Sequence, residues 1–188
     1  MEFHDIINMD QISLVTTPLI GKIVAPKGAK QVLVRGEQRT RECMTVCICV
    51  RADGTFMFTT FIFKKLKTHK KLVGFPTENL YLLGEKGWFK SEFFNEWYTK
   101  LHDELFPPYK DVALFANCPV IQKEMSRHVI LLIDMAPAHK VEALPKLKHS
   151  DQIHIVRIPP GCTPYLQPLD AGINHPIKAK YCNEILGW

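Results

Sequence analysis

The chain has 188 residues, of which 46% are hydrophobic and 23% are charged, and its formal net charge is +5 at pH 7. This composition is typical of one globular domain with a substantial core, and it excludes a disordered chain. No apolar run approaches the roughly 20 residues of a membrane span. The sequence has no C-x-x-C pair, the spacing typical of a zinc ribbon or knuckle. Without a secretory signal, we expect reduced cysteines and no membrane partner. The basic excess suits a polyanionic partner.

The first half of the chain predicts strands. Residues 6–9 form a short apolar strand with Asp10 set into it. Residues 43–63 predict a hairpin, because two β-rich runs flank Asp53 and Gly54, a dipeptide favoured in tight turns. Cys47 and Cys49 lie one pleat apart in this hairpin, which indicates core packing. A further short strand is possible at residues 80–83.

An amphipathic helix follows over residues 91–106. Ser91 is its expected N-cap, and the two prolines at 107 and 108 end it. The apolar residues repeat at helical spacing and predict a buried stripe: Phe94, Trp97, Tyr98, Leu101 and Leu105. The acidic residues show no pairing typical of catalysis and predict a solvated face: Glu92, Glu96, Asp103 and Glu104.

The second half begins with five consecutive apolar residues, 129–133, typical of a strand buried on both faces of a parallel sheet. Asp134 follows directly, and Pro137 stands where a first helical turn tolerates a missing N–H, so we expect a helix over residues 137–144. Residues 153–158 alternate like another strand. Four prolines in residues 159–168 predict an extended segment that carries Asp170 to a final helix over about residues 171–186.

This order of elements is strand, hairpin, helix, strand, helix, strand, helix. It predicts a mixed α/β sheet, antiparallel at one side and parallel at the other, with helices on both faces. That is the element order of the ribonuclease H-like fold. We expect one domain over residues 1–188.

Three carboxylates are expected at the ends of these elements. Asp10 and Asp134 follow strands that could be neighbours, and the proline-rich segment brings Asp170 to the same edge. Three nearby acids repel one another unless a cation joins them, and oxygen-only ligands select hard ions such as Mg²⁺. Two such ions clamp the attacking and leaving oxygens of a phosphoryl displacement. The alternative is structural: Asp134 and Asp170 cap helices, and Asp10 is a surface residue.

Six segments occur in an order that closely resembles the DDE-type transposase catalytic domain of the pogo/Tigger group, in the Tc1/mariner superfamily, with jerky and centromere protein B as relatives. The late run is the most specific of them. The segments are INMDQ (7–11), TVCICVRADGTF (45–56), FIFK (61–64), KGW (86–88), LLIDMAPAHK (131–140) and IPPGCTPYLQPLDAGINHPIK (158–178).

By this resemblance Asp10, Asp134 and Asp170 match the catalytic triad, which binds two Mg²⁺ or Mn²⁺ ions. His139 matches the family's histidine after the second acid, and it would support a metal ligand or face DNA. A histidine on a helix surface is the alternative. The resemblance implies cleavage and strand transfer of DNA in the nucleus, with DNA as partner, a possible homodimer and no small-molecule substrate.

Two departures from the family pattern favour an alternative function. The family usually has asparagine after the second acid, where this chain has Met135. The group also carries amino-terminal helix-turn-helix domains, for which there is no room before Asp10, so we expect the catalytic domain alone, as a fragment, a decayed copy or a domesticated derivative. The alternative is a domesticated, non-catalytic module that binds nucleic acid or another protein.

A cluster of lysines lies after the hairpin, at Lys64, Lys65, Lys67, Lys70 and Lys71. These side chains would contact DNA phosphates and add an affinity that falls with salt. The run could also serve as a nuclear-import signal. A solvated loop is the alternative.

Overall fold

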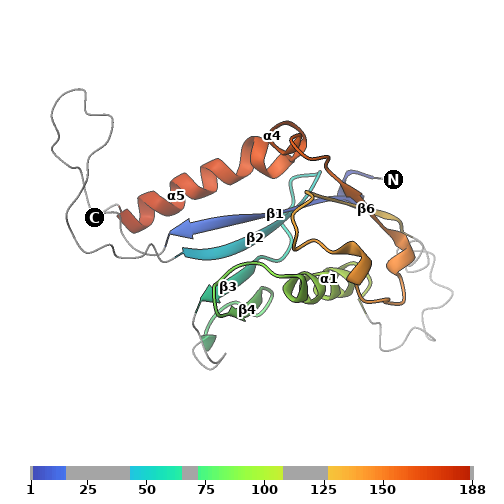
Figure 1. Ribbon diagram of the computed structural model, residues 1–188, viewed down its shortest axis with the longest axis horizontal. Helices are drawn as coiled ribbons and strands as arrows, with labels where there is room; N and C mark the ends of the chain where they lie inside the picture. The colour runs from blue at the N-terminus through green and yellow to red at the C-terminus, as the bar shows by residue number, and fades with distance from the viewer. Residues whose placement is uncertain (1, 16–42, 65–71, 108–126, 187–188) are drawn as a thin grey trace.

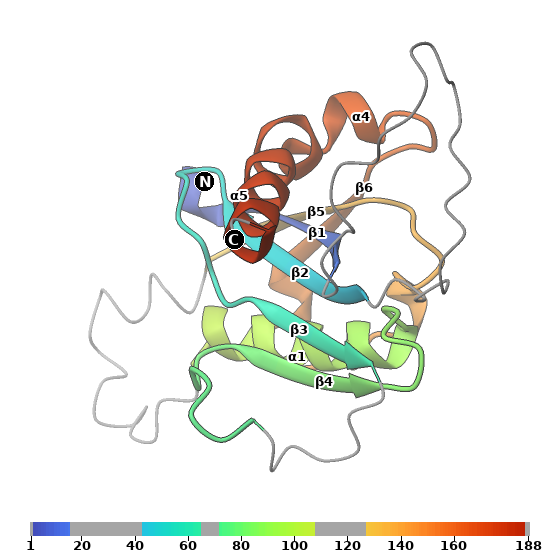
Figure 2. The same cartoon turned by 90° about the vertical axis from the view of Figure 1, so that its left-hand side faces the viewer.

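The structure is a computed structural model that describes residues 2–15, 43–64, 72–107 and 127–186. One six-stranded sheet organises them, with strand order β4-β3-β2-β1-β5-β6. Figure 1 labels its strands except β5, which is labelled in Figure 2. The strands are β1 (Ile6–Val15), β2 (Cys43–Arg51), β3 (Thr60–Lys64), β4 (Leu80–Gly84), β5 (Val129–Ile133) and β6 (Ile153–Arg157). The predicted hairpin forms β2 and β3, and the possible strand at residues 80–83 is β4.

The sheet is mixed, as predicted, but its antiparallel part lies in the middle. β1 pairs with β2 and β2 with β3 in antiparallel register. β5 lies parallel to β1, and β6 lies parallel to β5. β4 lies parallel to β3 at the opposite edge, which the prediction of an antiparallel side missed.

A helix covers each face of the sheet (Figure 2): α1 (Ser91–Leu105) on one face and α5 (Asn174–Leu186) on the other. Alternation along β1 supplies both cores, because successive side chains of a strand point to opposite faces. Ile7 and Met9 pack with the buried stripe of α1. Ile12 and Leu14 pack with Leu169 and with the residues that α5 turns toward the sheet, among them Ile177 and Tyr181.

The start of α1 differs from the prediction, although its buried stripe is confirmed. Ser91 is the first helical residue, and Lys90 is the N-cap, without a side-chain capping hydrogen bond. The first intrahelical bond runs from the Phe94 N–H to the Lys90 carbonyl, at 3.0 Å. Phe94 is fully buried, so packing rather than a cap positions this end of the helix.

The helix predicted over residues 137–144 is wrong. This segment holds a tight turn and one 3₁₀ turn, Val141–Ala143. Leu144 is extended, with ψ 145°, because Pro145 follows it and disfavours the helical region for the preceding residue. Prolines at both ends leave too few residues to nucleate a helix, and the turn points His139 into the core instead.

The segment before Asp170, by contrast, is more helical than predicted. Thr163–Leu166 forms a short helix, α4, with a proline in its first turn, where the missing N–H costs nothing. A π-helical turn, Leu169–Ile173, then leads directly into α5. Pro176 lies just beyond that turn and excludes the regular i→i−4 hydrogen bond there. Within the described ranges, no helix combines the length and apolar character of a membrane span.

Candidate functional site

The register of β1 and β5 places Asp10 and Asp134 at the same level of the sheet. Ile6 pairs with Ile130 and Asn8 with Leu132, and the same offset of 124 residues relates Asp10 to Asp134. β5 ends before Asp134, whereas β1 continues to Val15 because β2 pairs with it throughout. Asp10 is therefore in mid-strand rather than at an element end, at the point where β1 loses its parallel neighbour. In open α/β sheets, the carboxyl ends of parallel strands are where ligands bind.

A buried network of amides ties the segment before Asp170 to this point. The Asn8 side chain donates to the Leu132 carbonyl at 3.0 Å and to Gln167 Oε1 at 3.2 Å. Gln167 donates to the Met9 carbonyl at 3.0 Å, and the Leu169 N–H donates to Asn8 Oδ1 at 3.0 Å. Both amide side chains are buried, and their partners satisfy them. The sequence pattern assigned no role to either residue.

Asn174 joins the first and third acids. Its Nδ2 donates to Asp10 Oδ2 at 2.6 Å and to Asp170 Oδ1 at 3.0 Å. Only 3% of Asn174 is exposed, and it lies four residues after Asp170, one helical turn away. Sequence reasoning missed this residue, although the spacing of four that puts two side chains on one helix face could have indicated it.

Asp10 is a buried acid whose charged form is unfavourable. It is 8% exposed, and burial is the main cause that raises its pKa from 3.8 to about 6. The charge of Asp170 is the next cause, and that of Asp134 is a smaller one. The Gln11 backbone and Asn174 oppose the shift by donating hydrogen bonds to the carboxylate. A cation would relieve the repulsion that remains.

Asp134 lies in an environment that favours its charged form instead. His139 Nδ1 lies 2.7 Å from Asp134 Oδ1, which also accepts the Ala136 N–H at 3.2 Å. These bonds, that from His139 above all, lower the pKa of Asp134. His139 is buried against Phe94, with ring centroids 4.9 Å apart, so it is not the helix-surface histidine of the alternative.

The hydrogen bonds of His139 define its tautomer. Its Nε2 meets the Gln11 side-chain nitrogen, which can only donate, so Nε2 is the acceptor. Nδ1 then carries the proton that it donates to Asp134. The imidazole therefore holds one carboxylate oxygen in place, as a histidine beside a metal ligand or a nucleophile commonly does.

The structural alternative for the three acids is not what the molecule shows. Asp134 is followed by a turn rather than a helix, and Asp170 lies within the π-helical turn, whose N-cap is Pro168. Asp10 is buried.

The structure brings two of the three acids together. Asp10 and Asp170 meet at Asn174, but Asp134 is turned toward His139. Among the described residues, no three His, Cys, Asp or Glu side chains are grouped to hold one metal ion. The oxygen donors of Asp10, Asp170 and Asn174 suit a hard divalent cation.

Of the lysine cluster, only Lys64 lies in the described part of the chain, where it is exposed at the end of β3. Lys65, Lys67, Lys70 and Lys71 lie outside the described residues. Their expected contacts with DNA stay a prediction.

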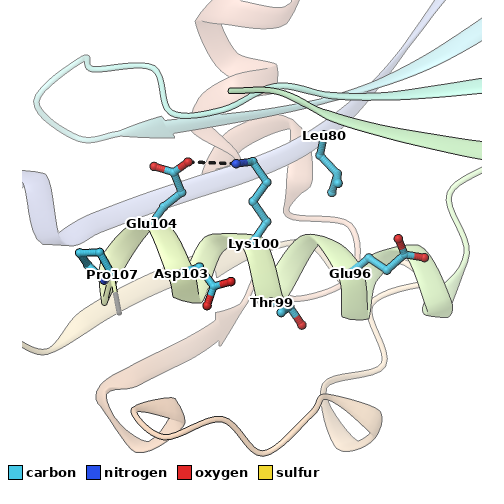
Figure 3. A pocket seen from close by; sticks show the side chains of 7 residues that line it. All are labelled: Leu80, Glu96, Thr99, Lys100, Asp103, Glu104 and Pro107. Carbon is cyan, nitrogen blue, oxygen red and sulfur yellow. Dashed lines mark hydrogen bonds and ion pairs between the residues drawn. The ribbon is translucent and has the colours of Figure 1, made fainter. Parts of the chain in front are cut away.

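A groove along α1 is a poor candidate for binding a polyanion (Figure 3). Its lining residues are Leu80, Glu96, Thr99, Lys100, Asp103, Glu104 and Pro107. Lys100 already pairs with Glu104 at 3.0 Å, which leaves the other two carboxylates in excess. All four acids of α1 are exposed, so the predicted solvated face is confirmed. Phosphate would be repelled from this side of the molecule.

Comparisons with known proteins agree with this architecture. The family model of the DDE superfamily endonuclease matches residues 41–188. Among solved structures, a pre-cleavage Mos1 transpososome matches with a TM-score of 0.55 and 14% identity, over 95% of this chain and 43% of that one. The Mos1 mariner paired-end complex with Mn matches with a TM-score of 0.53 and 14% identity, over 96% of this chain and 43% of that one. The predicted ribonuclease H-like fold is thereby confirmed, and the chain spans less than half of each Mos1 chain.

Proposed function

Because this chain belongs to the DDE superfamily endonucleases, whose model matches residues 41–188, we propose that it is a catalytic domain for divalent-metal-dependent cleavage and strand transfer of DNA, of the pogo/Tigger type. One observation carries the proposal. Asp10 and Asp170, at opposite ends of the chain, accept hydrogen bonds from the same nitrogen, and Asp134 leaves the neighbouring strand at the level of Asp10.

The residues have distinct parts in this proposal. Asp10 and Asp170 would hold a Mg²⁺ or Mn²⁺ ion, and Asp134 with Asp10 would hold a second. Bound ions of this kind activate an attacking oxygen and stabilise the leaving oxygen of a phosphodiester. His139 holds Asp134 in one orientation, and the amides of Asn8 and Gln167 hold the backbone before Asp170 against β1. No nucleophilic side chain is required.

DNA is the proposed partner. The similar solved structures are described as a transpososome, a paired-end complex with a transposon end and a strand transfer complex of Mos1. The net charge of +5 has the sign that attracts a phosphate backbone. A nuclear location, a homodimer and phosphate contacts from the lysine cluster belong to the same proposal.

Nicking of supercoiled plasmid in the presence of Mn²⁺ tests the function. The wild-type chain should convert supercoiled plasmid to open circles, and Asp134→Ala should not. Circular dichroism and thermal unfolding show whether the variant is still folded. The proposal fails if neither the wild-type chain nor a folded Asp134→Ala variant nicks plasmid, in Mn²⁺ or in Mg²⁺.

A second candidate function is a non-catalytic module for nucleic-acid or protein binding. The orientation of Asp134 toward His139 favours it, since the described residues then hold no group of three acids ready for a metal. The half-exposed Met135, beside Asp134, favours it too. Thermal unfolding separates the two: a working triad gains Tm with millimolar Mn²⁺, because a ligand of the native state stabilises it. A non-catalytic module shows no gain that Asp10→Asn or Asp170→Asn removes.

A further inference from the structure

We propose that Asn174 is a switchable ligand of the divalent cation: it bridges Asp10 and Asp170 through Nδ2 in the metal-free protein and turns its Oδ1 to the ion in the loaded one. This inference rests on the proposed function, because it concerns the same carboxylates. It adds to the three acids a fourth residue, of a different chemical kind.

The amide nitrogen of Asn174 lies where a shared ion would bind. Nδ2 lies 2.6 Å from Asp10 Oδ2 and 3.0 Å from Asp170 Oδ1, so its two N–H groups point at both carboxylates. A Mg²⁺ ion shared by these oxygens would lie about 2.1 Å from each. The ion would therefore have to occupy the space that the N–H groups fill. Since two positive groups cannot share that space, the amide must move when the ion binds.

The amide oxygen of Asn174 lacks a donor within the described ranges. Asn174 Oδ1 is buried without a hydrogen-bond partner among the described residues, whereas Nδ2 has two acceptors. A buried acceptor without a donor is unfavourable. A half turn about the Cβ–Cγ bond exchanges nitrogen and oxygen in nearly the same volume. The cation would then give Oδ1 the partner that it lacks.

A carboxamide oxygen is an ordinary ligand for hard divalent cations. Asparagine suits both states. In the metal-free protein its nitrogen offsets the repulsion between the two carboxylates, and in the loaded protein its oxygen adds a neutral ligand to the ion. Aspartate would add a third negative charge to the metal-free site, and a leucine would leave the two carboxylates unbridged.

Direct Mn²⁺ binding to the folded protein tests the proposal, measured by titration calorimetry and by the electron paramagnetic resonance signal of free Mn²⁺. Loss of a ligand predicts that Asn174→Ala binds Mn²⁺ about 10-fold more weakly than wild type, a factor worth about 1.4 kcal/mol. Asn174→Asp, which keeps an oxygen at the same place, should bind at least as tightly as wild type. Asn183→Ala, an exposed asparagine on the same helix, should leave the affinity unchanged.

The opposite result has a clear meaning. If the amide only fills the site, then Asn174→Ala removes a competitor and binds Mn²⁺ as tightly as wild type or more tightly. That outcome overturns the switch and leaves the proposed function intact. A wild-type chain that binds no Mn²⁺ at millimolar concentration overturns both.

A measurement on the wild-type chain avoids the risk that a variant misfolds. The side-chain NH₂ resonances of Asn174, identified by their absence in Asn174→Asp, should shift during a Mg²⁺ titration, while those of Asn183 should not. Unchanged Asn174 resonances at saturating Mg²⁺ contradict the proposal.

Discussion

The candidate site has two halves, which we name the bridged pair (Asp10 and Asp170, joined by Asn174) and the histidine pair (Asp134 and His139). The two environments shift the pKa of a carboxylate in opposite directions. In the bridged pair, burial and a second acid raise the pKa of Asp10 to about 6. In the histidine pair, an imidazole donor lowers the pKa of Asp134. The bridged pair is held under a repulsion that a cation would relieve. The histidine pair is already satisfied, so it would have to reorient to join a shared ion.

This difference follows from the two faces of the sheet. Asp10 points to the face covered by α5, where Asn174 donates to it and to Asp170. His139 approaches from the face covered by α1, where Phe94 and Gln11 hold its ring. The end of β5 is therefore the place where the oxygen ligands of one face meet a supporting histidine from the other.

The largest expected effect is on activity. Asp134→Ala removes an oxygen ligand and should lower the rate of plasmid nicking about 1,000-fold, or about 4 kcal/mol in transition-state free energy. Unfolding by urea should show that the variant keeps most of its stability, because Asp134 is half-buried at the end of a strand. A nicking rate within 10-fold of wild type would show that the histidine pair takes no part in the chemistry.

Asp10→Asn should separate the stability of the bridged pair from its function. A raised pKa in the folded state means that the charged form is penalised, so the penalty is absent below pH 4, grows between pH 4 and 6, and is complete above pH 6. The variant should therefore be about 3 kcal/mol more stable than metal-free wild type at pH 7.5. Urea unfolding at pH 4 and pH 7.5 measures this. An equal difference at both pH values would contradict the assignment of the raised pKa to burial and to the charge of Asp170.

Gln167→Leu should weaken the tie that brings Asp170 to Asp10. The substitution leaves the Met9 carbonyl without its donor and should cost about 2 kcal/mol of unfolding free energy. Asn8→Leu should cost a similar amount, and the double variant should cost less than the two single ones together, because both belong to one network. Additive costs would show that the two amides stabilise the fold independently.

His139→Phe should have the smallest effect on stability, because the ring still packs on Phe94. It removes the donor to Asp134, so we expect a loss of about 1 kcal/mol at pH 7. Since the lowered pKa of Asp134 adds stability above its unfolded pKa and loses it as pH falls through the folded value, the loss should disappear in acid. His175→Phe, at an exposed histidine of α5, is the control. A loss that is independent of pH would indicate packing alone.

The elements with strong patterns could be predicted from the sequence. The apolar run of residues 129–133, the alternating hairpin strands and the stripe of α1 all form as expected, because their side-chain periods match their environments. The segment of residues 137–144 and the start of the last helix could not be predicted so well. Their proline and glycine signals are compatible with several turns, and contacts with distant residues select among them.

Hydrophobic periodicity along the chain was enough to predict the sheet-forming strands and the amphipathic helix, and sequence motifs singled out three acids as candidate site residues. How these acids are placed follows only from the folded chain: Asp10 lies beside Asp170 through Asn174, and Asp134 lies beside His139. The reason is physical. A hydrophobic period is a local property that a short stretch of chain carries, whereas a hydrogen bond such as that between Asn174 and Asp10 joins residues 164 positions apart and exists only once the sheet has formed.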